Sequence, residues 1–467
     1  MKKLWLILLS LGLVMAFSVS AFAVDVKVSG EYYAAGLYLD KTTLNKNSWI
    51  SGTGTEEDPY VTHNPGPSTA FFYQRLRVGT DFIVSPCLKL VTRFDAMERI
   101  WGGQRSPVDG GTTPATLAVD SAGTRAENEN IAVDWAYINY VAPVGTFDVG
   151  YMNFGATGTI FGNSAVPAGR IKYYSPLIKG AININADITK TTDKSYSAVT
   201  TTTNATDLDK DAYAIEGVYN FKNDKASGKA AFKIAYTRDA TKRVSDEYKQ
   251  TYFTFTPWAI AKIGPVALQA EINWATGDYS DYDTATPGDV DLDNLSAFVD
   301  ATATFAPVYV GATVAYVSGD DPDTKDKKEG GSLKGGYDWN PCLIMFNYYD
   351  TYNWVGAISG YDGSVVNGGM SNALFFQGRV GVRPTPQLDI NLAIAYATAD
   401  EKPTGYANSN YGTEIDITGT YKITNNLSYM LGAGYLFTGD YYKGKNVQGN
   451  NDVDNDFIVL NKLTLSF

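Results

Sequence analysis

The chain has 467 residues, of which 19% are charged and 44% are hydrophobic, and its formal net charge is −12. This acidity argues against nucleic-acid binding, which requires a basic surface. With two cysteines and one histidine, the sequence has no CxxCH haem-attachment motif and little material for His-based catalysis or for a zinc site of histidines. We therefore expect no cofactor.

The first 23 residues predict an export signal. Met1-Lys2-Lys3 precedes an apolar run from Leu4 to Phe17, and Ala21-Phe22-Ala23 follows as a small-x-small cleavage site. We expect cleavage after Ala23, which leaves residues 24–467 as one domain. After this leader the sequence has no apolar run long enough to cross a bilayer as a helix. For an exported chain of this kind, a closed β-barrel is the main remaining way to span a membrane.

Apolar and polar residues alternate along the mature chain, with Pro, Gly and Asn between the runs. Very short turns are predicted at 85–87, 143–145, 263–265, 306–307, 384–386 and 425–426, and broader turns at 175–180 and 222–228. The other connections are long and polar, at about 40–69, 100–128, 153–168, 190–210, 239–249, 278–293, 319–370, 400–410 and 438–455. We predict an all-β, antiparallel up-and-down transmembrane barrel of about 18 strands (16–20), with short periplasmic turns and long extracellular loops.

The alternation also predicts which side chains face lipid. Along 182–188 the even positions are apolar and the odd positions polar, and the same pattern runs along 388–396. A charge on the lipid face at the midplane costs about 2–4 kcal/mol, so the apolar set must face outward and the polar set the lumen. The 33 tyrosines suit aromatic girdles at the two membrane interfaces.

The longest connection, residues 319–370, either folds into the barrel or stays outside it. Its aromatic residues predict an ordered plug or constriction, although packing onto the barrel rim is the simpler alternative. The apolar stretch Leu343–Tyr349 within it would add a strand if it were extended. The aromatic residues are Tyr337, Trp339, Tyr348, Tyr349, Tyr352 and Trp354.

Charged residues on the predicted lumen face are the candidate functional residues. The basic set is Arg75, Arg77, Lys89, Arg93, Arg170, Lys172, Lys233 and Arg379. The acidic set is Asp95, Asp134, Glu216, Glu271, Asp300, Glu414 and Asp416. Two interpretations stay open: the basic residues form a wall of positive potential that favours anions, or they pair with the acidic residues and keep the lumen hydrated.

Glu414 and Asp416 lie two residues apart on one strand face, a spacing that suits acid–base catalysis. Since neither a nucleophile nor a histidine accompanies them in the sequence, we expect an ion pair with a nearby arginine instead.

Three further features have simple interpretations. Asp289, Asp291 and Asp293 form a weak Ca²⁺ candidate, but solvated acidic loops, bridged to lipopolysaccharide by divalent ions, are the preferred interpretation. We expect no other metal site. His63 is predicted to be a solvated loop residue. Cys87 and Cys342 fall at opposite ends of the predicted barrel, and we expect them to stay unpaired.

Three segments carry a resemblance to known outer-membrane proteins. The segment at 411–417, with Tyr421-Lys422-Ile423 after it, and the segment at 431–437 resemble late strands of the alginate-export family. The segment at 149–155 is similar to a strand end of that family, but Tyr151-Met152 replaces its Arg-Gln pair. The resemblance implies an 18-stranded monomeric barrel that conducts anionic sugars. The final strand, ending at Phe467, resembles the signal read by the barrel-assembly machinery.

Together these patterns predict an outer-membrane porin of a Gram-negative bacterium, a passive channel for small hydrophilic and anionic solutes such as organic acids or acidic oligosaccharides. The alternative is a structural barrel that sheathes or anchors a partner, such as an extracellular electron-transfer cytochrome. An enzyme is disfavoured. The predicted surroundings are outer-membrane lipid and lipopolysaccharide, and the sequence leaves open whether the chain is a monomer or a homotrimer.

Overall fold

A computed structural model describes residues 24–51, 55, 61–102, 131–153, 158–162, 167–194, 207–244, 247–284, 288–333, 339–446 and 449–467. The predicted leader and its cleavage site at Ala23 lie outside the described residues, as do Tyr337 and most of the connection at 100–128. The backbone of His63 is described, but its side chain is not.

The sheet has 19 members, and without the two-residue strand β16 (Lys327–Lys328) it is an antiparallel barrel of 18 long strands. The first long strand pairs with both the second and the last, so the sheet closes. The predicted fold class is therefore confirmed. The long strands are β1 (Asp25–Leu39), β4 (Thr69–Ser85), β5 (Leu88–Ile100), β6 (Ala132–Ala142), β7 (Gly145–Met152), β8 (Ala168–Tyr174), β9 (Ile182–Thr192), β10 (Lys210–Lys222), β11 (Ala226–Asp239), β12 (Tyr248–Ile263), β13 (Val266–Tyr282), β14 (Val290–Phe305), β15 (Val308–Val317), β19 (Ala373–Thr385), β20 (Leu388–Thr398), β21 (Asn410–Lys422), β22 (Leu427–Thr438) and β23 (Asp456–Ser466).

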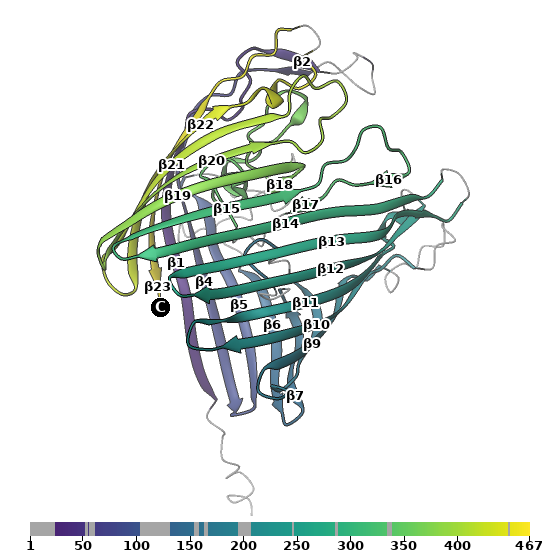
Figure 1. Cartoon of the computed structure of the whole chain (residues 1–467), viewed down its shortest axis with the longest axis vertical. Coiled ribbons are helices and arrows are strands. Elements are labelled where there is room, and N and C mark those ends of the chain that lie inside the picture. The colour runs from purple at the N-terminus through teal and green to yellow at the C-terminus, as the bar shows by residue number, and fades with distance from the viewer. Residues whose placement is uncertain are drawn as a thin grey trace, which may run out of the picture.

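Sequential strands are neighbours, so the chain runs up and down around the barrel (Figure 1). One end carries the short turns, such as the one between Ser85 and Leu88, together with Asp25 and Ser466. The opposite end carries the long connections, and it is called the long-loop end below. Strands β11 to β14 reach 14 to 17 residues, longer than β7 and β8 with eight and seven, so the wall is uneven in height.

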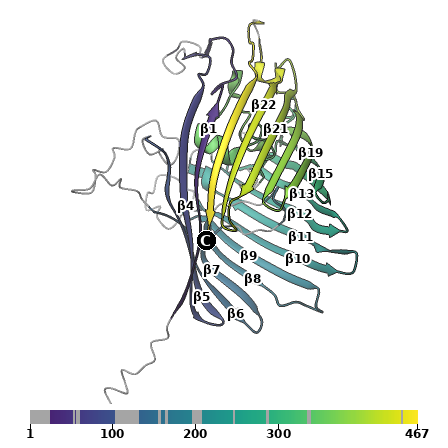
Figure 2. The same cartoon turned by 90° about the vertical axis from the view of Figure 1, so that its left-hand side faces the viewer.

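The first and last strands form the closing seam (Figure 2). Their register pairs Glu31 with Ser466 and Leu39 with Ile458. The backbone of Gly30 exchanges two hydrogen bonds with that of Phe467, at 2.8 and 3.0 Å. A Cβ at Gly30 would lie 2.5 Å from the backbone oxygen of Arg77 and 2.6 Å from the ring of Phe467, so only glycine allows this close approach.

The two faces of the barrel differ as the alternation predicts. On β20, Leu392, Ile394 and Tyr396 are 40, 51 and 41% exposed on the outside, whereas Ala393 and Ala395 are 5 and 2% exposed on the inside. An exterior of exposed Val, Ile, Leu and aromatic side chains continues around the other strands. Such a surface is stable next to hydrocarbon rather than water.

Outward-facing aromatic residues lie near both ends of the strands. Tyr213 and Tyr219 are 48 and 53% exposed near opposite ends of β10. Tyr435 and Tyr429 are 41 and 40% exposed in the same arrangement on β22. This is the distribution expected for two interfacial girdles.

Short elements occupy the long connections. They are β2 (Trp49–Ser51), β3 (Val61–His63), β17 (Ser332–Leu333), β18 (Met370–Ser371), the 3₁₀ helices η1 (Thr241–Val244), η3 (Tyr361–Gly363) and η4 (Asp440–Lys443), the π-helical turn η2 (Tyr348–Tyr352) and α2 (Asn353–Val355). No helix among the described residues has the length and apolar character needed to cross a bilayer. The stretch Leu343–Tyr349 forms no strand, so the connection between β15 and β19 leaves the strand number even.

Candidate functional site

The longest connection folds into the lumen and docks on the inner wall. Residues 339–366, called the plug segment below, place backbone amides on two carboxylates of β21. Ile344 and Met345 each donate an N–H to Glu414 at 2.7 Å, and Leu343 donates to Asp416 at 3.2 Å. Because amides that leave the sheet need new partners, lumen carboxylates are strong anchors for an irregular segment.

The plug segment also contacts the wall at the closing seam. Asp350 accepts a hydrogen bond from Lys462 of β23 at 2.7 Å. The Arg75 guanidinium lies over the rings of Tyr33 and Tyr349, with 5.1 and 5.3 Å to the ring centroids. These cation–π contacts place a basic residue of β4 beneath the plug segment.

Trp354 extends the same contact, since its ring lies 4.4 Å from that of Tyr73 on β4. The plug segment is therefore held by side chains of β4, β21 and β23 together. The alternative that the aromatic residues of the long connection pack onto the barrel rim is wrong for Tyr349 and Trp354, because both dock on the inward face of the strands.

A second inner segment, residues 158–162 between β7 and β8, docks on β13. Thr159 donates both its N–H and its hydroxyl to Glu271, at 2.7 and 2.8 Å. A Cβ at Gly162 would clash with the Glu271 carboxylate, so a larger residue here would have to push that side chain aside. Glu271 is 2% exposed under this cover.

The two inner segments meet in an aromatic cluster. Phe161 stacks on Phe298 of β14 at 4.9 Å, and Trp339 of the plug segment packs edge-on against Phe161 at 5.2 Å. Trp339 also contacts Phe375 of β19 at 5.7 Å. The cluster ties both segments to the wall and narrows the lumen at this height.

A cavity of about 350 Å³ remains beside the plug segment. Its lining includes Ile160 and Trp339 from the inner segments, and Asp300, Arg379 and Asp416 from the wall.

The basic and acidic candidates of β4, β5 and β6 form one ionic network. Arg77 makes a two-pronged contact to Asp95, at 2.7 and 2.6 Å, and lies 3.5 Å from Asp134. Arg93 contacts Asp134 at 3.0 Å and lies 3.6 Å from the ring centroid of Trp135. Pairing of basic with acidic candidates therefore occurs along this wall.

Pairing recurs elsewhere on the wall. Arg379 contacts Asp300 at 2.6 Å, and Lys89 contacts Asp81 at 2.7 Å near the short-turn end. Arg75 lies 3.6 Å from Glu31.

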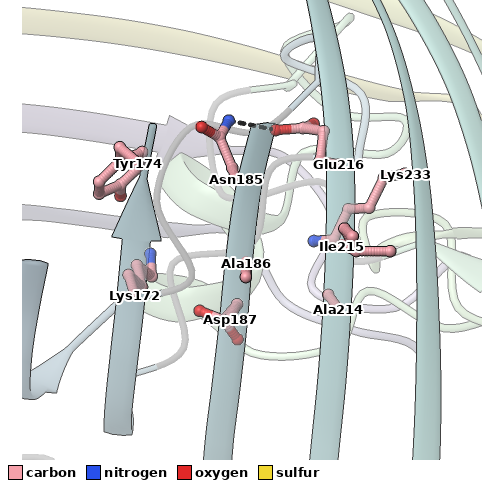
Figure 3. A pocket seen from close by; sticks show the side chains of 9 residues that line it. All are labelled: Lys172, Tyr174, Asn185, Ala186, Asp187, Ala214, Ile215, Glu216 and Lys233. Atoms are coloured by element: carbon pink, nitrogen blue, oxygen red, sulfur yellow. Dashed lines mark hydrogen bonds between the residues drawn. The ribbon is translucent and has the colours of Figure 1, made fainter. Parts of the chain in front are cut away.

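Strands β8 to β11 contribute a second charged patch (Figure 3). Lys172, Asp187, Glu216 and Lys233 line one pocket there, and Glu216 accepts a hydrogen bond from Asn185 at 2.9 Å. Arg170, on the same strand as Lys172, lies 3.7 Å from Asp187. The structure thus brings the candidates of β8, β10 and β11 onto a single surface, together with Asp187 of β9, which sequence reasoning did not single out.

The prediction that Glu414 and Asp416 form an ion pair with a nearby arginine is wrong. Within the described ranges, no arginine or lysine lies at ion-pair distance from either carboxylate, and both accept backbone N–H groups instead. The thiol of Cys342 also lies beside them, a nucleophile that sequence reasoning missed. Residues 342 and 414 are far apart in sequence, so no local pattern could reveal this proximity.

Asp289, Asp291 and Asp293 do not gather into a three-residue cluster among the described residues. Asp289 accepts the N–H of Tyr282 at 3.0 Å, and Asp293 accepts the indole N–H of Trp274 at 2.9 Å. These carboxylates therefore already have protein partners.

The two cysteines are free, with Cys87 exposed at a short turn and Cys342 buried. Burial, with the nearby charges of Glu414 and Asp416, raises the pKa of the Cys342 thiol well above its usual value. A neutral buried thiol is unreactive, because the thiolate is the nucleophile.

A water-soluble maleimide is therefore expected to label Cys87 alone in the folded barrel, and both thiols after denaturation. Mass spectrometry of the labelled chain measures this difference, and Cys87→Ser is the control that should abolish native labelling. Rapid native labelling of Cys342 would show that the plug segment does not dock as described.

A closed barrel with an apolar exterior and a polar, charged lumen defines the class of the protein, a transmembrane β-barrel. The chain is similar in fold to the outer membrane protein opdK from Pseudomonas aeruginosa, with 12% identity and a TM-score of 0.46 over 94% of this chain and 99% of that one. OccK9 (OpdG) of the same organism is 13% identical, with a TM-score of 0.49 over 95% of this chain and 99% of that one. The outer membrane channel DcaP of Acinetobacter baumannii is 13% identical, with a TM-score of 0.42 over 96% of this chain and 99% of that one. No family model and no curated protein matches the chain, so the likeness to the alginate-export family stays a resemblance.

Proposed function

We propose that this barrel is a narrow outer-membrane diffusion channel for small hydrophilic solutes. The observation that carries the proposal is the pair of inner segments, which are hydrogen-bonded to lumen carboxylates and narrow the lumen without filling it. A wall of charged and polar side chains suits hydrated solutes. Transport along such a lumen would be passive.

The same arrangement disfavours a sheath around a partner protein. A folded cytochrome in the lumen would have to displace both inner segments, together with the aromatic cluster of Phe161, Trp339 and Phe298. This displacement would leave buried amides and carboxylates without partners, which is costly.

Within this proposal, the channel prefers anions. The inner segments cover Glu271, Glu414 and Asp416, which are 2, 0 and 5% exposed, so these carboxylates are shielded from a passing ion. On β4 and β5 the side chain of Arg77 is 29% exposed, against 8% for its partner Asp95. The arginine therefore faces the lumen over its partner, whereas Lys172 and Lys233, at 6 and 9% exposure, are themselves largely covered and contribute less to the lining.

Planar-bilayer recording of the purified barrel tests the proposal. We expect discrete single-channel current steps. Under a KCl gradient, we expect a reversal potential shifted toward the equilibrium potential of chloride. Liposome swelling with neutral sugars and monocarboxylates of matched size should show faster entry of the carboxylates. An insulating barrel would reject the channel itself, whereas cation preference would reject only the basic lining.

A further inference from the structure

Cys342, Glu414 and Asp416 form a compact group of metal-ligating atoms where the plug segment meets β21. One ligand atom of each residue, the Cys342 Sγ and a carboxylate oxygen from each acid, lies within 4.8 Å of the other two. All three residues are buried, at 3, 0 and 5% exposure. The group therefore lies on the contact that holds the plug segment in place.

The group has an unfilled acceptor. Asp416 Oδ1 is buried and receives no hydrogen bond from an N–H or hydroxyl group of the described residues, while its second oxygen accepts from Leu343. Both Asp416 and Cys342 line the cavity beside the plug segment. A buried carboxylate oxygen without a partner carries a large desolvation cost, so its position next to two other donor atoms points to a cation.

The charge of the group leads to the same conclusion. Two carboxylates lie side by side, and within the described part of the chain neither has a lysine or arginine at ion-pair distance. Backbone N–H groups supply hydrogen bonds but no net charge. Buried charges need a counter-charge, and a divalent cation would offset most of the negative charge of two carboxylates and a thiolate.

The donor atoms select the metal. Ca²⁺ and Mg²⁺ take oxygen ligands, whereas Zn²⁺ accepts thiolate sulfur together with carboxylate oxygen. Zinc bonds of about 2.0–2.3 Å would require the three side chains to tighten slightly around the ion. The amide of Gln377 points at Cys342 Sγ from 3.9 Å, as a supporting hydrogen bond to a metal-bound sulfur would.

We propose that Cys342, Glu414 and Asp416 bind one Zn²⁺ ion, which fastens the plug segment to β21. Binding displaces the thiol proton to solvent, and the sulfur and two carboxylate oxygens coordinate the ion. The adjacent cavity of about 350 Å³ leaves room for water as a fourth ligand.

Metal analysis of the full-length barrel in detergent tests this site. Protein exposed to ZnCl2 and then desalted in metal-free buffer should retain about one zinc per chain. Cys342→Ala and Asp416→Asn should each lose most of it, whereas Cys87→Ala and the double variant Asp289→Asn/Asp291→Asn should retain it. Retention far below one zinc, or equal retention in all variants, would overturn the proposal.

Cobalt supplies a second readout that does not depend on a variant that folds. Wild-type protein loaded with Co²⁺ should show the near-ultraviolet absorption of a thiolate–cobalt bond, and Cys87→Ala should keep it, because that cysteine lies outside the group. Cobalt bound without this absorption would mean that Cys342 is not a ligand. Two carboxylates that share a proton in place of a metal would give neither signal.

Discussion

Glu414→Ala is expected to raise the single-channel conductance of the barrel several-fold. The substitution removes the acceptor of the Ile344 and Met345 N–H groups, both of which bond to it at 2.7 Å. Buried donors left without partners cost about 1–3 kcal/mol each, so the docked state of the plug segment loses stability and the segment undocks more often. An undocked segment opens the lumen from β21 to the closing seam.

Two further variants calibrate this result. Glu414→Gln keeps one acceptor oxygen, and it should give a smaller increase with more flicker. A chain in which residues 340–366 are replaced by a short Gly/Ser linker defines the fully open barrel. If removal of that stretch leaves the conductance unchanged, the plug segment is not the constriction. Native maleimide labelling of Cys342 should rise in parallel with conductance in Glu414→Ala.

Arg77→Gln is expected to move the reversal potential toward cation preference. Arg77 holds Asp95 through two short contacts and shields it, with side-chain exposures of 29 and 8%. Removal of the guanidinium uncovers a carboxylate and changes the local net charge by a full unit. Salt screens the interaction between such a charge and a passing ion beyond about 10 Å at 0.1 M, so the change in reversal potential should be largest at low ionic strength.

The double variant Arg77→Gln/Asp95→Asn is the matched control. It removes both charges of the pair, and so selectivity should return most of the way to that of the wild type. Arg383→Gln provides a second control, because Arg383 pairs with Asp389 near a short turn, at a side-chain exposure of 50%. An unchanged reversal potential in Arg77→Gln would show that this pair does not contribute to the ion path.

The barrel could be predicted because its signals are local. Side chains alternate between the two faces of a strand every two residues, and turns such as 263–265 are marked by Gly and Pro. The limits and the faces of the strands could therefore be predicted from short stretches of the sequence. The position of the plug segment follows from distant contacts. Its amides bond to Glu414, about 70 positions away, and nothing in the alternation of 410–422 marks that carboxylate as a docking point.

The charged candidates show the same limit. Alternation placed Arg77 and Asp95 on inward faces, but their pairing depends on the register between β4 and β5, which sets residue 77 opposite residue 95. Alternation likewise placed Glu414 and Asp416 on one inward face, but it could not show that a distant loop covers both of them. The face on which a charged residue lies follows from the local sequence, whereas its ion-pair or hydrogen-bond partner depends on the strand register and loop positions of the whole fold.

The pairing of Gly30 with Phe467 sets a requirement for biogenesis. The edge of the first strand cannot be satisfied until the final strand has been made and delivered, so every intermediate presents two open edges with apolar side chains beside them. Such intermediates would aggregate if left alone in water. An open ribbon of strands therefore needs protection from water until β1 and β23 have paired.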